Sequence, residues 1–123
     1  MSASPIGLMF SDDLLFTSRV GGAAESLGLT LRTARTAAAL ERDLEPLSCV
    51  LVDLQLPGLD LPSLVRTIRE NYPQCRIVGY GSHVAVEVLK AAREAGCDLV
   101  LPRSKFVEDL NRDLPKWFGR VSL

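Results

Sequence analysis

Two short apolar runs that each end in carboxylates constrain the fold of this chain more than any other feature. Residues 6–10 lead into Ser11-Asp12-Asp13, and residues 49–52 lead into Asp53. Short apolar runs that stop at acidic residues are typical of buried parallel strands with carboxylates at their carboxyl ends. In open α/β sheets, functional sites are built at that edge. Three carboxylates would repel one another there, so we expect a hard divalent cation such as Mg²⁺ to offset their charge.

Strand-like and helix-like segments alternate along the whole chain. The predicted strands are residues 6–10, 30–34, 49–53, 76–80 and 98–101. The predicted helices are residues 13–27, 36–44, 61–71 and 84–95, and a last helix that starts near Lys105 and ends or kinks by Pro115. Gly21 and Gly22 interrupt the first helix, and we interpret them as a place of close packing on the sheet. Trp117 and Phe118 are expected to pack back onto the core.

Five strand–helix units imply right-handed crossovers and a parallel sheet covered on both faces. The sequence therefore predicts an α/β fold, a flavodoxin-like (βα)5 doubly wound parallel sheet with strand order 2-1-3-4-5. This order places Asp12, Asp13 and Asp53 together at the point where the strand order reverses. It also makes the strand at 98–101 an edge, where Pro102 is acceptable.

Composition and length narrow the class of protein. With 123 residues, we expect one domain, residues 1–123, that is long enough to bury a core. The net charge of −1 argues against a purely electrostatic nucleic-acid or membrane binder. No apolar stretch approaches the roughly 20 residues of a membrane span. The three cysteines, Cys49, Cys75 and Cys97, sit in or beside apolar runs without a CxxC pair, which favours core thiols in the cytoplasm.

At this point the chain resembles a receiver domain of a two-component response regulator, a CheY-like domain. The resemblance extends from about Gly7 to Trp117. It rests on Asp12-Asp13 after the first strand, on Asp53 with Leu56-Pro57-Gly58 and Asp60 after the third, and on Glu94-Ala95-Gly96-Cys97 before the fifth. The ordered set within a (βα)5 pattern carries more weight than any single acidic pair.

The resemblance implies a phosphorylation switch. Asp53 matches the phospho-acceptor, whose carboxylate would attack the phosphohistidine of a sensor histidine kinase or phosphotransfer protein. Asp13 and Asp53 would bind Mg²⁺, with Asp12 acting largely through water and the backbone carbonyl of Gln55 completing the protein ligands. The alternative is structural, because strand-end aspartates such as Asp12 or Asp13 often only cap the next helix.

Three positions depart from the family pattern. Where the family has a Thr or Ser at the end of the fourth strand, an ungapped count gives Gly81, so Ser82 can substitute only if the loop slips by one residue. Arg103 stands in place of the family lysine; it is otherwise a surface charge or a permanent partner of Asp53, and Lys105 is a less favoured substitute. Val100 replaces an aromatic residue that changes rotamer on activation in many members.

These matches and departures leave three functional hypotheses. The first is a phosphorylatable receiver, not an enzyme, that signals through protein contacts. The second is a pseudo-receiver that acts as a phosphorylation-independent interaction module. The third, an enzyme or flavin binder on the same fold, ranks last because acidic residues replace a phosphate loop and Gln55 replaces a second catalytic aspartate.

With no output domain expected after Leu123, any output partner would bind the face made by the helix at 84–95, the strand at 98–101 and the last helix. That face would include His83, Glu87, Arg103, Lys105 and Trp117. An ordinary loop position is the preferred reading of His83.

Overall fold

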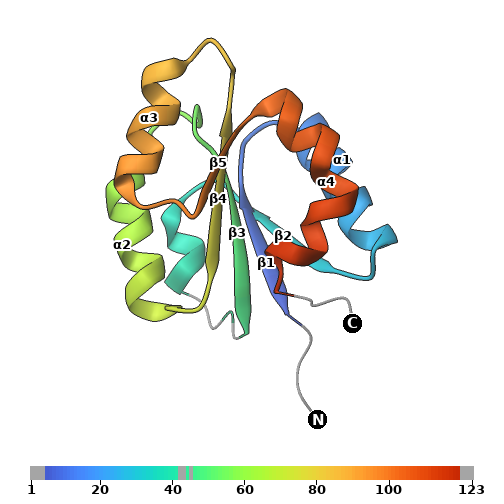
Figure 1. Ribbon diagram of the computed structural model, residues 1–123. Coiled ribbons are helices and arrows are strands. Elements are labelled where there is room, and N and C mark those ends of the chain that lie inside the picture. The colour runs from blue at the N-terminus through green and yellow to red at the C-terminus, as the bar shows by residue number, and fades with distance from the viewer. Residues whose placement is uncertain (1–4, 42–43, 45, 120–123) are drawn as a thin grey trace.

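The protein is described by a computed structural model that covers residues 5–41, 44 and 46–119. Five parallel strands form one sheet in the order β2-β1-β3-β4-β5, which confirms the predicted topology (Figure 1). The strands are β1 (Ile6–Phe10), β2 (Thr30–Ala34), β3 (Leu47–Asp53), β4 (Arg76–Gly81) and β5 (Leu99–Pro102). Because β1 and β3 are neighbours, the carboxylates that follow them lie at the same edge of the sheet.

Helices cover both faces of the sheet (Figure 1). They are α1 (Leu14–Ser26), α2 (Leu61–Asn71), α3 (Val86–Ala95) and α4 (Arg103–Trp117), with a short 3₁₀ helix, η1 (Ala37–Glu41). In Figure 1, α1 and α4 lie together on one face, and η1, α2 and α3 on the other. Alternate residues of β1 and β3 supply the two apolar cores between these layers. These two strands are therefore buried on both sides of the sheet.

The helix predicted at residues 36–44 is wrong in type and length. Within the described residues the chain forms only the five-residue 3₁₀ helix η1, in which the Ala39 amide donates to the Thr36 carbonyl. Leu40 is the one buried residue of this turn. Helices in proteins are held mainly by an apolar face, and one leucine offers too little of it to hold a longer α-helix on the sheet. Residues 42 and 43 of the predicted helix lie outside the described residues.

The last helix differs from the prediction at both ends. It begins at Arg103 instead of near Lys105, and it does not end at Pro115 but continues to Trp117. The proline sits in the final turn, where only one backbone donor is lost, and the Phe118 amide still donates to the Leu114 carbonyl at 3.1 Å. The buried Leu114, Trp117 and Phe118 hold this turn, and the predicted packing of Trp117 and Phe118 is confirmed.

Gly7 and the pair Gly21-Gly22 have opposite environments. Gly7 lies on β1 beneath the ring of Phe118, which occupies the space where a side chain would be. Gly21 and Gly22 lie within α1, and a Cβ atom on either would meet nothing within 4 Å. The expectation that this pair allows close packing of helix on sheet is therefore wrong, because neither glycine faces the sheet closely.

Candidate functional site

The acidic residues predicted for the site gather at the carboxyl ends of β1 and β3. Asp53 is the last residue of β3 and is partly buried, Asp13 precedes α1 and is also partly buried, and Asp12 is exposed. The charges of Asp12 and Asp13 lie near enough to raise the pKa of Asp53. The strand order thus brings these three carboxyl groups to one edge, as the sequence predicts.

Asp13 has both of its carboxylate oxygens occupied. Oδ1 accepts a hydrogen bond from the Phe16 amide at 3.0 Å, which makes Asp13 the N-cap of α1. Oδ2 accepts from the Arg103 guanidinium at 3.1 Å. These two bonds, that of the Phe16 amide first, hold the pKa of Asp13 below its usual range. The helix-capping role that the sequence left open for Asp13 is therefore confirmed.

Asp53 lies in a less favourable environment for its charge. Burial raises the pKa of its carboxyl group, and the neighbouring charges of Asp12 and Asp13 add to this effect. The Gln55 amide, which donates to Asp53 Oδ1 at 3.0 Å, and the Arg103 charge act in the opposite direction. One Asp53 oxygen is thus oriented by the following turn, and the carboxylate sits in a site that favours compensation of its charge.

Arg103 supplies a positive charge at this edge. It is the first residue of α4, and its guanidinium lies 4.0 Å from the centre of the Phe16 ring. The same group pairs with Asp13, so the permanent partner considered for it is Asp13 and not Asp53. Stacking on Phe16 and the ion pair together fix the guanidinium in place.

The hydroxyl expected near the end of β4 is absent at Gly81, and at Ser82 it accepts a hydrogen bond within the following turn. Gly81 is buried and ends β4. The Ser82 hydroxyl accepts from the Val84 amide at 3.3 Å, and the Ser82 amide donates to Gln55 Oε1 at 2.8 Å. Ser82 therefore serves the turn before α3.

The donor set fits Mg²⁺ chemically, although its present arrangement does not form a cage. Carboxylate oxygens are the ligands that this cation prefers. Within the described residues, no three Asp, Glu, His or Cys side chains are grouped closely enough to hold a metal ion. Asp13 Oδ2 also accepts a hydrogen bond from Arg103, so a metal ion there would share this oxygen with the guanidinium.

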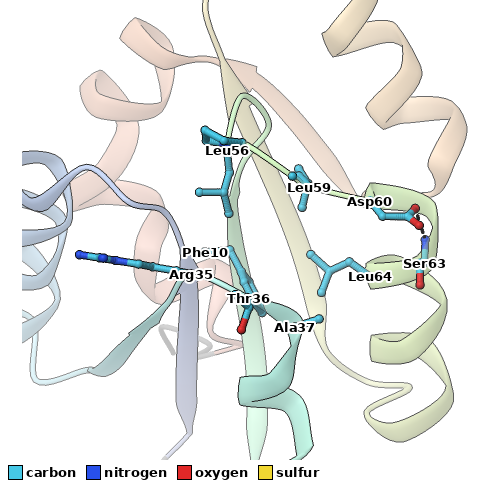
Figure 2. Close-up of a pocket in the computed structure, with 11 residues that line it drawn as sticks. Phe10, Arg35, Thr36, Ala37, Leu56, Leu59, Asp60, Ser63 and Leu64 are labelled. Atoms are coloured by element: carbon cyan, nitrogen blue, oxygen red, sulfur yellow. Dashed lines mark hydrogen bonds between the residues drawn. The ribbon is translucent and has the colours of Figure 1, made fainter.

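Two hollows flank the sheet edge. An open one of about 520 Å³ lies beside Arg103 and is lined by Arg19, Ser82, His83, Arg103, Ser104 and Val107. A more enclosed one of about 290 Å³ has Phe10, Leu56 and Leu64 among its apolar lining. Figure 2 shows that in this second cavity Asp60 is bonded to Ser63, while Arg35 extends away from them. None of the acidic residues predicted for the site lines it, so we place the function at the acidic edge.

Sequence reasoning assigned no role at the site to three of its aromatic or polar neighbours, and interpreted Tyr80 as a packing residue. Phe16 supports Arg103, Ser11 is buried beside the acidic pair, and the Tyr80 side chain is wholly buried. Tyr80 lies directly opposite Asp53 in the pairing of β3 with β4. That register, together with the alternation of side chains along strands, is the signal that points to Tyr80.

The proposed partner face is placed only in part as expected. His83, Glu87, Arg103 and Lys105 are exposed near α3, β5 and α4, whereas Trp117 is 5% exposed and belongs to the core. Large apolar side chains are exposed at Leu14, Leu15, Val84, Val86 and Val88. In the described part of the chain, no helix has the length and apolar character needed to span a membrane.

Solved structures with the same fold are response regulators and their receiver domains. A response regulator from Thermotoga maritima has a TM-score of 0.75 at 20% identity, and covers 95% of this chain and 99% of that one. A putative response regulator from Chloroflexus aurantiacus J-10-fl has a TM-score of 0.77 at 18% identity, and the match covers 96% of this chain and 100% of that one. A CheY-like receiver domain protein from Methanospirillum hungatei JF-1 has a TM-score of 0.70 at 17% identity, and the match covers 98% of this chain and 100% of that one.

Sequence comparison adds a short match. The sensor protein TorS of Escherichia coli (strain K12) is 38% identical over 46 residues. This match covers 37% of the chain, and the chain spans only 5% of the length of TorS. No family model matches the sequence. Together with the topology, the structural likenesses establish that the fold is the CheY-like receiver fold predicted from the sequence.

Proposed function

We propose that this chain is a receiver module of two-component signalling, and that Asp53 is its phospho-acceptor. The carrying observation is the position of Asp53, partly buried at the carboxyl end of β3, beside the acidic end of β1. The receiver fold and the short match to a sensor protein support the same pathway class. The chain itself acts as a signalling element and not as an enzyme with its own substrate.

The chemistry assigned to Asp53 is nucleophilic. A carboxylate oxygen attacks the phosphorus of a phosphohistidine, forming an O–P bond while the P–N bond breaks. The bonding electron pair stays on the imidazole nitrogen, which takes up a proton. The Arg103 guanidinium lies at the same edge and offsets part of the charge that the phosphoryl group brings.

Mg²⁺ is the proposed cofactor. Asp13, Asp53 and the Gln55 carbonyl would hold it, with Asp12 acting through water, and it would neutralise charge on the phosphoryl oxygens. The cation would compete with the Arg103 guanidinium for Asp13 Oδ2. Metal affinity is therefore expected to be lower than three free carboxylates would give.

The proposed partner that donates the phosphoryl group is a sensor histidine kinase or a phosphotransfer protein in the cytoplasm. Leu14 and Leu15, which follow the acidic pair, are 67% and 87% exposed. Exposed leucines beside a polar site are typical of a protein-binding surface. Output would pass to a further partner through the face of α3, β5 and α4.

A pseudo-receiver is the second candidate, and one contact favours it. The ion pair between Arg103 and Asp13 gives the acidic edge a resident cation, while Gly81 offers no hydroxyl for a phosphoryl group. Such a domain would bind its partner without modification of Asp53.

Intact-mass spectrometry separates the two candidates. The protein is incubated with acetyl phosphate and Mg²⁺ beside an Asp53→Asn control, and both are checked for folding by circular dichroism. One added phosphoryl group in the wild type, absent from the control, supports the phospho-acceptor. A folded wild type without an adduct would refute that role and favour the pseudo-receiver.

A further inference from the structure

A buried hydroxyl without a partner lies beneath the acidic edge. The Tyr80 side chain is 0% exposed, and its hydroxyl has no hydrogen-bond partner within the described residues. It is also the one buried side-chain oxygen or nitrogen in that part of the chain for which this is so. Buried polar groups are normally paired, because an unpaired one forfeits its bond to water. An exception in a native core calls for an explanation.

The strand register points this hydroxyl toward the site. Tyr80 on β4 pairs with Asp53 on β3, so the two residues are direct neighbours across the sheet. The Tyr80 ring lies between the sheet and the layer of α1 and α4. Its centroid is 5.2 Å from the centroid of the Phe16 ring and 4.5 Å from that of Phe106, on which it stacks. From β4 the ring reaches toward Ser11 at the end of β1.

The groups that shift the pKa of Tyr80 belong to the same acidic edge. Burial raises the pKa of Tyr80 well above its ordinary value, and the nearby charge of Asp53 adds to the effect. The phenol therefore stays protonated and is a hydrogen-bond donor. The Ser11 hydroxyl approaches and lowers the pKa of Tyr80, yet the two oxygens do not meet in hydrogen-bond geometry.

The residues that follow Tyr80 at the end of β4 place no hydroxyl on its face of the sheet within the strand. Gly81 has none, and a Cβ atom there would point instead toward Leu89, Gln55 and Leu54. The Ser82 hydroxyl accepts from the Val84 amide within its own turn. Tyr80 and Gly81 are successive strand residues, so their side chains leave opposite faces of the sheet.

We propose that the Tyr80 hydroxyl is the buried hydrogen-bond donor to a phosphoryl group on Asp53. The proposal rests on the phospho-acceptor role of Asp53 given above. Gly81 has no hydroxyl that could donate to the phosphoryl group, and the proposal gives this role to Tyr80, the preceding residue of β4. Among the described residues the hydroxyl has no partner in the unmodified protein, and it becomes paired when phosphoryl oxygens arrive beside it.

This assignment predicts that one substitution affects the complex with a phosphoryl mimic but not the unmodified protein. Tyr80→Phe removes only the hydroxyl and keeps the ring in its aromatic contacts. The unmodified protein should not lose stability, since no hydrogen bond is lost. The complex with a phosphoryl mimic should weaken, because a bond to a charged acceptor disappears.

Tyr72→Phe is the matched control. Tyr72 is the other tyrosine of the chain and is 8% exposed. Its hydroxyl accepts from the Leu44 amide at 3.3 Å. Tyr72→Phe should therefore lower the urea midpoint of the unmodified protein and leave binding of the mimic unchanged.

The experiment titrates beryllofluoride with Mg²⁺ into the wild type and both variants, followed by amide NMR, beside urea denaturation without the mimic. Tyr80→Phe is expected to weaken beryllofluoride binding about tenfold with an undiminished urea midpoint. Unchanged binding by Tyr80→Phe in a protein whose wild type binds would overturn this proposal alone. A lower urea midpoint for Tyr80→Phe would also overturn it, since the hydroxyl would then be paired already. A wild type that does not bind the mimic would overturn the phospho-acceptor role and this proposal with it.

Discussion

Gly7→Ala tests how closely the end of the chain packs on the sheet. An alanine Cβ at this position would lie 2.2 Å from Phe118 Cζ and 2.9 Å from both of its Cε atoms. Phe118 is 1% exposed, so its ring has no free space into which it can turn. Either the ring or the β1 backbone must move, and both belong to the core.

The expected cost is about 2 kcal/mol of unfolding free energy, in the range of about 1–3 kcal/mol for overpacked cores. Complete loss of the Phe118 contacts sets an upper limit of about 3–5 kcal/mol, the cost of truncating a buried phenylalanine. For a chain of this size, a cost of about 2 kcal/mol lowers Tm by roughly 6–10 °C.

Gly22→Ala is the matched substitution with the opposite expected sign. Gly22 lies in the middle of α1 and is exposed, and an added Cβ atom meets nothing within 4 Å. Alanine is the better helix former by about 0.8–1 kcal/mol. The same chemical change should thus stabilise the protein at one glycine and destabilise it at the other.

Urea denaturation followed by far-UV circular dichroism measures both effects, provided that the denaturant slopes agree with the wild type. The double variant Gly7→Ala, Phe118→Leu provides the second check. Its smaller side chain should recover part of the loss, giving a favourable coupling energy. Equal changes in Gly7→Ala and Gly22→Ala, or a Gly7→Ala protein as stable as the wild type, would refute the packing argument.

Four further outcomes are expected. Asp53→Asn should be more stable than the wild type at neutral pH, with the difference fading as the pH falls toward 3.8, because burial raises the pKa of this carboxyl group. Asp13→Asn should be less stable at neutral pH, and that difference should vanish below 3.8, because the pKa of Asp13 is lowered. Both follow from urea midpoints measured across pH, and a difference independent of pH would contradict them. Arg69→Met should cost about 1–2 kcal/mol in the same assay, since the guanidinium bonds the Cys75 carbonyl at 2.8 Å and two further acceptors; a loss below about 0.3 kcal/mol would show these bonds to be unimportant. Gly81→Ser should leave beryllofluoride binding unchanged, because its side chain would leave the sheet face opposite Tyr80, toward Leu89, Gln55 and Leu54; tighter binding would show that a hydroxyl at this position reaches the mimic.

Most of the fold could be predicted because its central strands, β1, β3 and β4, are buried on both faces. The run from residue 49 to 52 is fully buried, and such runs between helical patterns leave few other topologies. The segment around η1 could not be predicted in the same way. Its alanines favour a helix locally, but whether a helix persists depends on contacts that only the tertiary structure reveals.

The sequence predicts which carboxylates form the site, but not the hydrogen bonds and ion pairs that they make. Strand order alone brings Asp13 and Asp53 to one edge, so their proximity follows from the sequence. The bond from Arg103 to Asp13 joins residues 90 positions apart and depends on where α4 begins. The role of Tyr80 likewise depends on the register between β3 and β4, which the sequence leaves open by one or two residues.

The aromatic contacts behind the acidic edge give this protein an optical reporter of its own. Arg103 lies on Phe16, which contacts Tyr80, and Tyr80 stacks on Phe106. Phe106 in turn stacks at 5.4 Å on Trp117, the single tryptophan of the sequence. A rearrangement of these rings changes the surroundings of the one indole. Its emission can therefore follow events at the edge of the sheet without any attached dye.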